Sequence, residues 1–333
     1  MGINFIVKRV LFRADAAPHI GIGDLTSLVH ISKYFSEEYE HYFIIRKYKA
    51  GVNLVKKYSV NNCFIIDAHC RLEDEIEYIN DFIGQYNIDI LFFEITERKL
   101  SQYIGITKKV KKVAVNFDGD ILDDLDLVID WDVEAYKYFD VSNYQKTKFL
   151  LGPKYVILPK EFYSKRVRDR VNDLVGKKIL IAMGGADELD LTGVVTDTII
   201  HSNLNVELNI IVGSGYEYKN RLENTLKNSG FKYSIKQNIT NMLDEYLSCD
   251  IGVGAGGLTS SELVATKVSP ILIATYKHQV ARCEYFNDMG WAKYLGYREF
   301  KKSDLIEAIS NPLRPIVENI FETKVIIDEI EKI

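Results

Sequence analysis

The stretch RADAAPHIGIGDLTSL, residues 13–28, combines charged residues, a glycine turn and the start of an expected helix. Glycines permit tight turns and the close approach of a ligand. Asp24 stands at the expected helix start, where its carboxylate can accept hydrogen bonds from free backbone N–H groups as an N-cap. The same carboxylate follows an expected strand, and open α/β sheets bind ligands outside the carboxyl ends of their strands. We therefore expect Asp24 to cap the helix, to face a ligand, or both.

The turn MGGAD, residues 183–187, follows another apolar strand. Gly184 and Gly185 would let the backbone approach a phosphate or a sugar. The same residues also suit an ordinary strand-to-helix loop, so the sequence leaves both interpretations open.

The stretch GVGAGGLTSSEL, residues 252–263, reads as a strand end, two glycines and a helix start. A helix N-terminus presents free N–H groups and the positive end of the helix dipole, which together attract anions. Glu262 lies one turn into the helix, where it can accept hydrogen bonds from ribose hydroxyls or close a capping box. The adjacent glycines favour a ligand. The residues expected to bind a nucleotide here are Gly256, Gly257, Leu258, Thr259, Ser260 and Glu262.

The segment ATYKHQ, residues 274–279, follows the next expected strand and would face the same ligand. Lys277 is a suitable counter-ion for phosphate. His278 has the chemistry for acid–base catalysis, although a single histidine can also be purely structural. Gln279 is a further expected nucleotide contact.

Other patterns exclude several enzyme classes. The dinucleotide fingerprint G-x-G-x-x-G would need a third glycine at Thr26, and no G-x-S-x-G elbow of a hydrolase triad occurs. The acids of residues 118–126 resemble a DxD metal clamp, but acids spread through a loop are more typical of a solvated turn. The four cysteines form no CxxC pair and suit reduced thiols. We expect neither a metal nor a cofactor.

The composition excludes broad electrostatic partners. The net charge is -5, whereas capture of nucleic acid or of an anionic membrane needs a basic surface. The N-terminus lacks the long apolar segment of a signal peptide, and no apolar run is long enough to span a bilayer. These features predict a cytoplasmic protein, monomeric or weakly dimeric, that binds no nucleic acid and does not insert into a membrane.

Short apolar strands alternate with amphipathic helices, the pattern of a parallel sheet covered on both faces. The alternation restarts at residues 178–182, and 333 residues suit two domains. With a seam near Gly152, we expect an α/β protein of two Rossmann-like domains, residues 1–152 and 153–333. The expected terminal helix, residues 315–332, crosses back over the seam.

Together these stretches resemble the UDP-diacetamido-trideoxy-altrose hydrolase family of pseudaminic acid biosynthesis and the related spore-coat polysaccharide proteins. The matching segments are RADAAPHIGIGDL, GPKYVILPKEF, MGGAD, NITNMLDEYLSCDIGVGAGGLTSSEL and ATYKHQ, spread over residues 9–296. That family is similar in fold to the peptidoglycan N-acetylglucosaminyltransferase. The resemblance therefore implies a GT-B arrangement, with a cleft between the two domains.

The sequence departs from the family pattern on the side of the reacting sugar. The family has GxGH and then Arg at the first turn, where this chain has Asp24 and Ser27. Its Asp-x-Tyr motif is replaced by the FFEIT of residues 92–96, and its Asn-Gln pair by His278-Gln279.

The resemblance implies an enzyme that binds a nucleotide sugar, with UDP on the C-terminal side. The N-terminal residues that it assigns to the sugar are Arg13, Asp15, Gly21 and Gly23. A hydrolase would use Asp24 as the general base that activates water, and a GT-B glycosyltransferase would use it on an acceptor hydroxyl. A catalytically silent nucleotide-sugar binding protein is the third hypothesis.

Overall fold

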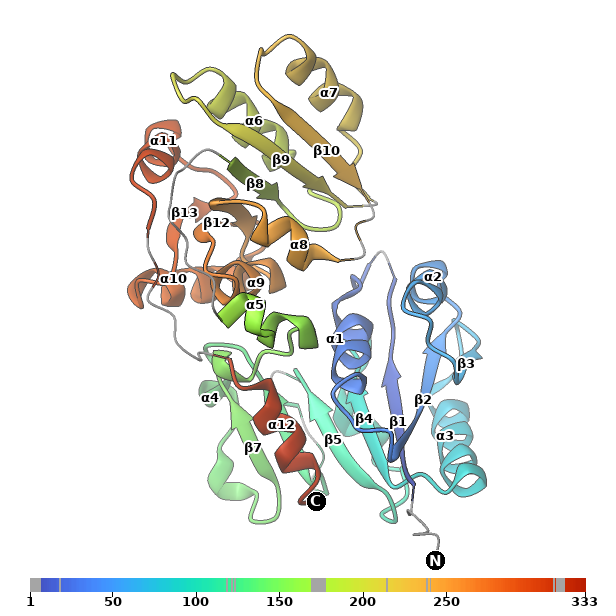
Figure 1. Ribbon diagram of the computed structural model, residues 1–333. Coiled ribbons are helices and arrows are strands. Elements are labelled where there is room, and N and C mark those ends of the chain that lie inside the picture. The colour runs from blue at the N-terminus through green and yellow to red at the C-terminus, as the bar shows by residue number, and fades with distance from the viewer. Residues whose placement is uncertain are drawn as a thin grey trace, which may run out of the picture. The chain divides into compact units, whose positions relative to one another are not determined.

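The computed structural model describes residues 7–333 apart from 18, 118, 121, 123, 169–177, 214, 238, 240, 314 and 316–320. The chain forms two compact units. We call them the N-terminal domain (Met1–Lys160 with Phe321–Ile333) and the C-terminal domain (Glu161–Ile320). Figure 1 shows that each unit is built around its own sheet, with helices packed against it.

The N-terminal domain holds a seven-stranded parallel sheet in the order β3-β2-β1-β4-β5-β6-β7. The buried runs of Val, Ile, Leu and Phe suit a sheet that is covered on both faces. The order reverses between β1 and β4, which pair as far as Ala14 and Glu94. The strands are β1 (Lys8–Ala14), β2 (Tyr39–Arg46), β3 (Cys63–Ile66), β4 (Ile90–Glu94), β5 (Lys111–Val115), β6 (Leu127–Asp130) and β7 (Lys148–Leu151).

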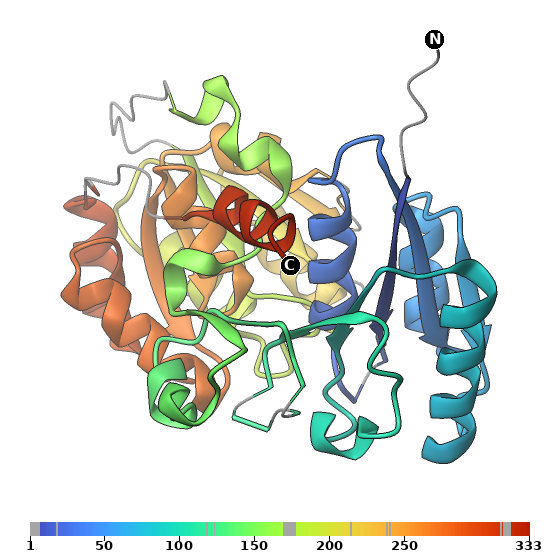
Figure 2. The ribbon, with the colours of Figure 1, turned by 90° about the horizontal axis from the view of Figure 1, so that it is seen from below.

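Helices cover both faces of this sheet. Leu11 belongs to a core cluster with Ile79 and Phe82 of α3, whereas its neighbour Phe12 packs against Phe35, which follows α1. Figure 2 shows α1 and α3 on opposite sides of β1. The helices are α1 (Gly23–Ser32), α2 (Lys49–Lys57), α3 (Leu72–Tyr86), α4 (Ala135–Tyr138) and α12 (Thr323–Ile330), with short 3-10 helices η1 (Leu100–Tyr103), η2 (Val141–Asn143), η3 (Pro153–Tyr155) and η4 (Lys160–Tyr163).

The C-terminal domain repeats the design with a six-stranded parallel sheet in the order β10-β9-β8-β11-β12-β13. Its reversal point lies between β8 and β11. The strands are β8 (Lys178–Ala182), β9 (Glu207–Val212), β10 (Tyr233–Gln237), β11 (Ile251–Ala255), β12 (Ser269–Ala274) and β13 (Lys293–Tyr297). The helices are α5 (Lys165–Arg168), α6 (Leu191–Ile200), α7 (Lys219–Lys227), α8 (Met242–Leu247), α9 (Leu258–Ala265), α10 (Val280–Asp288) and α11 (Lys302–Ser310), with η5 (Lys277–Gln279) before α10.

The predicted class, two Rossmann-like α/β domains, is the observed one. The division falls after Lys160 rather than near Gly152, because Val156, Ile157 and Leu158 are buried and the Tyr34 hydroxyl donates to the Leu158 carbonyl at 2.8 Å. The sequence pattern did not predict β7, β10, β13, α8 or α11. Strands β10 and β13 are half-buried at the sheet's edges, so they lack a continuous apolar run.

The terminal helix is shorter than predicted and belongs to the N-terminal domain. Helix α12 covers Thr323–Ile330, and residues 316–320 of the expected helix lie outside the described residues. The backbone N–H of Glu322 donates to the Lys154 carbonyl at 2.6 Å, and Glu329 pairs with Lys148 on β7. None of the helices in the described part of the chain is both long and apolar enough to cross a membrane.

Candidate functional site

Asp24 lies in the first turn of α1 and does not cap it, contrary to one of the two roles expected. The helix begins at Gly23, its N-cap is Ile22, and no side chain caps it. Instead, Oδ2 of Asp24 accepts hydrogen bonds from the backbone N–H of Thr96 at 3.1 Å and from its hydroxyl at 2.5 Å. Thr96 follows β4, the strand next to β1, so Asp24 stands at the reversal point of the sheet.

Burial makes the Asp24 carboxyl a weaker acid than an ordinary aspartate. Desolvation raises the pKa of Asp24 to about 6, and the hydrogen bonds from Thr96 only partly oppose it. A carboxyl with a pKa near 6 is largely ionised at pH 7 and accepts a proton more readily than an ordinary aspartate. General bases are commonly tuned in this way.

A second buried carboxyl, Glu94, ends β4 beside it. Asn116, which follows β5, donates to Oε1 of Glu94 at 3.0 Å. Among the described residues no group makes a hydrogen bond to Oε2. Burial first, and then the charge of Asp24, raises the pKa of Glu94 well above its ordinary value, against the hydrogen bond from Asn116. Glu94 was not among the predicted site residues, although a polar residue at the end of the apolar strand ILFFE is a usable signal.

Arg13 and Asp15 do not face a ligand. Their side chains are 0% and 1% exposed, so neither has surface with which to contact a sugar. Arg13 pairs with Asp15 and with Glu75 of α3, each at 2.7 Å, and Arg46 pairs with the other oxygen of Glu75 at 2.5 Å. Tyr103 donates to Glu75 at 2.8 Å. This buried network joins the ends of β1 and β2 to α3, and correct pairing is what makes such burial tolerable.

Gly21 and Gly23 are exposed at the start of α1. Gly21 has a φ of +82°, and Ala17 and Gly21 exchange backbone hydrogen bonds of 3.1 and 2.8 Å. Nothing lies within 4 Å of a Cβ added at either glycine. The turn therefore leaves room for a ligand beside Asp24.

In the C-terminal domain the two predicted glycine turns lie side by side. Strands β8 and β11 are paired, Ala182 opposite Gly254, so the turn with Gly184 and Gly185 and the turn with Gly256 and Gly257 leave the sheet at neighbouring positions. This is the reversal point, where open α/β sheets bind ligands. A Cβ added at Gly184 or Gly185 would meet nothing within 4 Å, so the turn is open in the side-chain direction of both glycines.

Asp187, the acid of the MGGAD turn, stabilises the start of a helix. Asp187 is buried and accepts the backbone N–H groups of Leu191 at 2.9 Å and Thr192 at 2.8 Å, which fixes the start of α6. Its two oxygens are thus engaged by the helix rather than directed at a ligand.

The start of α9 is held close to the following turn. A Cβ on Gly256 would lie 2.5 Å from Sγ of Cys283 and 2.9 Å from Cβ of Gln279, so packing alone demands this glycine. The N-cap Gly257 has no side chain, and Ser260 is buried with its hydroxyl donated to the Gly257 carbonyl at 2.6 Å. The first N–H groups of the helix, including those of Leu258 and Thr259, have no intrahelical acceptor.

Glu262 is not part of a capping box, because the N-cap of α9 is a glycine. Its Oε2 accepts the Tyr246 hydroxyl at 2.6 Å, and burial raises its pKa. The Tyr246 hydroxyl engages Oε2, and Oε1 is the second acceptor of this carboxylate.

Gln279 and His278 differ in placement. Oε1 of Gln279 accepts the backbone N–H and the hydroxyl of Thr275, both at 2.9 Å, and its Nε2 lies 3.5 Å from a Cβ added at Gly257. Its amide N–H groups are thus beside the start of α9. His278 is exposed and stacks on Tyr276, with ring centroids 5.8 Å apart.

The acidic loop shows no metal clamp in its described part. Asp118 and Asp123 lie outside the described residues, Asp120 accepts the Ser101 N–H at 3.2 Å, and Asp124 and Asp126 pair with Lys112 and Lys111. Over the described chain, no three His, Cys, Asp or Glu side chains are arranged to hold a metal ion.

Comparisons with known proteins agree with this architecture. Residues 179–324 match the glycosyltransferase family 28 C-terminal domain. An uncharacterized protein of Methanocaldococcus jannaschii is 30% identical over 165 residues, which make up 48% of this chain and 33% of that protein. The chain thus spans about a third of the length of this relative.

Two solved structures resemble the whole chain. MurG of Acinetobacter baumannii superposes with a TM-score of 0.63 and 14% identity, over 98% of this chain and 100% of that one. The UDP-GlcNAc 2-epimerase of Methanocaldococcus jannaschii gives 0.64 and 14%, over 97% and 99%. At this identity the likeness concerns the fold, which is the two-domain GT-B fold.

Proposed function

We propose that this protein is an enzyme that cleaves a nucleotide sugar between the anomeric carbon of the sugar and the diphosphate, with Asp24 as the general base. The observation that carries this proposal is the Asp24 carboxyl, held by Thr96 at the reversal point of the N-terminal sheet with a pKa of about 6. In a hydrolase, water attacks the anomeric carbon and its proton passes to Asp24. The bond between that carbon and the diphosphate oxygen breaks, and the nucleotide diphosphate leaves with the electron pair.

The nucleotide, which we propose is UDP, is assigned to the C-terminal domain. The N–H groups at the start of α9, around Gly256–Ser260, would hold the phosphates, since a helix N-terminus favours anions. Oε1 of Glu262 would accept from the ribose, and the Gln279 amide would donate beside Gly257. The open turn at Gly184 and Gly185 adds room on the neighbouring strand. Such fixed donors stabilise a leaving diphosphate without a metal.

The hydrolase assignment, within nonulosonate or surface-polysaccharide biosynthesis, rests on the sequence resemblance. The match of residues 179–324 to a glycosyltransferase domain supports a transferase as the second candidate, in which an acceptor hydroxyl replaces water. In both reactions Arg13 and Asp15 support the fold rather than the sugar, because they are fully buried. His278 remains a candidate second catalytic group, exposed after β12.

Release of UDP tests the proposal and separates the two reactions. The protein is incubated with a panel of UDP-sugars, with and without sugar acceptors, and free UDP is followed by a coupled assay. Release without an acceptor identifies the hydrolase, and release only with an acceptor identifies the transferase. Tight UDP-sugar binding with no release under either condition would contradict the enzyme and leave a binding protein.

A further inference from the structure

Three loops of the N-terminal domain converge on the carboxylate of Glu97. His19, in the loop between β1 and α1, has Nε2 2.6 Å from Oε1 of Glu97, which follows β4. Tyr48, after β2, donates its hydroxyl to the same carboxylate, 3.0 Å from Oε1 and 3.2 Å from Oε2. Strands β2, β1 and β4 are neighbours and parallel, so these loops all leave the sheet at the carboxyl ends of the strands.

Adjacent residues hold His19 and Asp24 in place. Thr96 holds Asp24 through two hydrogen bonds, and the next residue, Glu97, holds His19. The dipeptide Thr96-Glu97 therefore orients the Asp24 carboxylate and the His19 imidazole at the reversal point of the sheet.

The hydrogen bond to Glu97 decides which imidazole nitrogen is available. Burial raises the pKa of Glu97, but hydrogen bonds from His19 and Tyr48 and the charge of Arg46 outweigh it, so this pKa is lowered and the group is a carboxylate. A carboxylate beside Nε2 selects the tautomer with the proton on that nitrogen, and in this tautomer Nδ1 is the acceptor.

The His19–Glu97 pair contributes too little to folding stability to account for the fixed position of the ring. The His19 side chain is 58% exposed, whereas Glu97 is 19% exposed. Exposed ion pairs contribute only about 0–1 kcal/mol, so a ring fixed by a more buried carboxylate and a tyrosine suits ligand contact better than folding.

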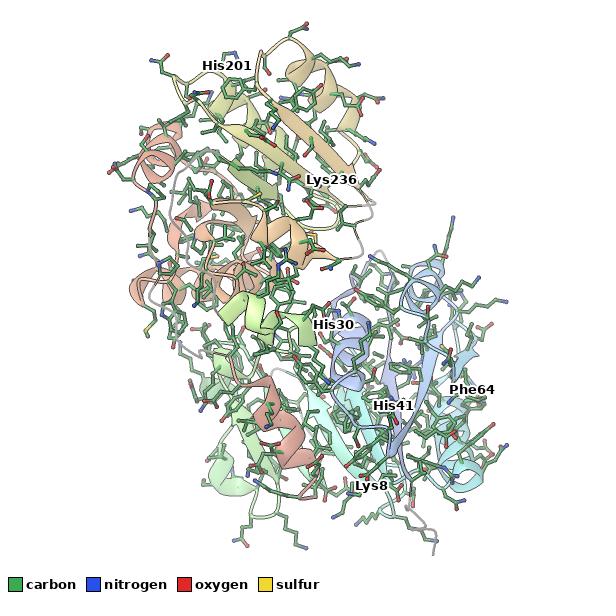
Figure 3. All side chains as sticks on the ribbon, viewed as in Figure 1. Lys8, His30, His41, Phe64, His201 and Lys236 are labelled. Carbon is green, nitrogen blue, oxygen red and sulfur yellow. The ribbon has the colours of Figure 1, made fainter. Side chains whose placement is uncertain are left out.

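Three of the other histidines, His30, His41 and His201, are less suited to contact a ligand. His30 and His41, labelled in Figure 3, lie within the N-terminal domain, and burial lowers the pKa of both, that of His30 to about 4. His201 in the C-terminal domain bonds through Nδ1 to the Asp197 carbonyl of α6 at 2.7 Å.

We propose that His19 is a sugar-contacting residue. Its Nδ1 accepts a hydrogen bond from a hydroxyl of the sugar in the nucleotide-sugar substrate, and Glu97 and Tyr48 are positioning residues that fix the ring. The assignment rests on the proposed function and extends it, because it names a residue that reads the sugar and not the nucleotide. The residue lies five positions before Asp24 and is joined to a partner 78 positions away, which a sequence pattern does not reveal.

The test compares binding of UDP with binding of UDP-sugars. Calorimetry is run in the Asp24→Asn background, which slows turnover, with UDP, UDP-N-acetylglucosamine, UDP-glucose and UDP-galactose as probes. His19→Ala should weaken binding of the preferred UDP-sugar about tenfold or more, the usual cost of a lost ligand hydrogen bond, and leave UDP unchanged. The matched control is His69→Ala, an exposed histidine after β3 in the same domain, which should change neither affinity.

Positioning is read from the conservative variants. His19→Asn keeps an acceptor near Nδ1 and should recover part of the loss. Glu97→Gln and Tyr48→Phe should each lower the affinity for the UDP-sugar by a smaller factor than His19→Ala, again without changing UDP binding. A purely structural role would instead lower the melting temperature and affect both ligands alike.

The outcomes separate this assignment from the proposed function. Equal losses for UDP and UDP-sugar, or no loss in His19→Ala, would overturn the sugar contact alone. If the Asp24→Asn parent binds UDP and gains no affinity from any sugar, His19 has no sugar to contact and the assignment is again wrong. If the unaltered protein binds none of the four probes, the proposed function fails as well.

Discussion

At the scale of single residues, the activity of Asp24 should depend on pH. Burial raises the pKa of this carboxyl to about 6, against two hydrogen bonds from Thr96. A general base works only when deprotonated, so the rate at saturating substrate should rise through pH 6 and level off above it. Initial rates of UDP release between pH 4.5 and 8.5 measure this profile.

The control for that profile is Thr96→Val, which removes the hydroxyl that donates to Asp24. A hydrogen bond to the charged form lowers a pKa, so its loss should shift the midpoint to higher pH. A rate that is flat from pH 4.5 to 8.5 would contradict Asp24 as the base.

Glu262 should contribute to nucleotide affinity. Its Oε2 is taken by Tyr246, and Oε1 is left for the ribose of the proposed nucleotide. Glu262→Ala should weaken UDP binding by about 1–3 kcal/mol, the cost of leaving a partner unsatisfied. Calorimetry with UDP checks this, with Glu307→Ala, an exposed acid on α11, as the control. Equal affinities of the two folded variants would remove Glu262 from the site.

Charged residues at strand ends show where sequence reasoning fails at this scale. Arg13 and Asp15 follow an apolar strand just as ligand-binding residues do, yet they complete a buried network with Glu75 of α3. The partner 62 positions away decides their role, and no local pattern contains it. The place of Asp24 at the start of α1 is predictable from the sequence, but its hydrogen bonds from Thr96, 72 positions away, are not, for the same reason.

At the scale of elements, the contact between α9 and α10 sets a steric limit at Gly256. A methyl group there would lie 2.5 Å from Cys283 and 2.9 Å from Gln279. Gly256→Ala should therefore destabilise the C-terminal domain by about 1–3 kcal/mol, as overpacking of a core does. Urea unfolding measures the change.

Gly185→Ala is the matched control, because a Cβ at this position meets nothing within 4 Å. Its unfolding free energy should stay close to that of the unaltered protein. If Gly256→Ala is equally harmless, the close packing of α9 against the turn at Gln279 is wrong. Adding Cys283→Ala to Gly256→Ala should recover part of the lost stability, since Sγ is the nearest obstacle.

The elements themselves were predictable where burial is complete. Strand β8 has the predicted bounds, residues 178–182, because it buries a continuous apolar run. Strands β10 and β13 were missed because edge strands are half-buried and carry mixed residues. The two glycine turns were recognised from composition, but only the pairing of β8 with β11 brings them together.

At the scale of the whole molecule, the last residues of the chain support its first domain. Phe321, Ile326 and Ile330 are buried, and Glu329 pairs with Lys148 of the N-terminal sheet. Deleting residues 321–333 should expose this apolar surface and destabilise the N-terminal domain by several kcal/mol, about 1.5–3 for each large side chain. Calorimetric melting should show an earlier transition, and a melting profile identical to that of the full chain would contradict the packing of α12.

The two domains have different proposed roles. The proposed nucleotide site lies in the domain that matches the glycosyltransferase family 28 C-terminal domain, and the proposed base lies in the other. Substitutions in the N-terminal site should therefore change turnover or sugar affinity and leave UDP affinity unchanged, whereas those at the start of α9 should change UDP affinity.

Turnover by the Asp24→Asn variant decides whether Asp24 is the general base. Asparagine keeps the size and can still accept from Thr96, but it cannot take a proton. The rate of UDP release from the preferred UDP-sugar should fall by roughly 100- to 10,000-fold, the range for losing a positioned base, while UDP affinity and melting temperature stay close to those of the unaltered protein. A folded Asp24→Asn protein that releases UDP at the unaltered rate would contradict the assignment of Asp24 as the base.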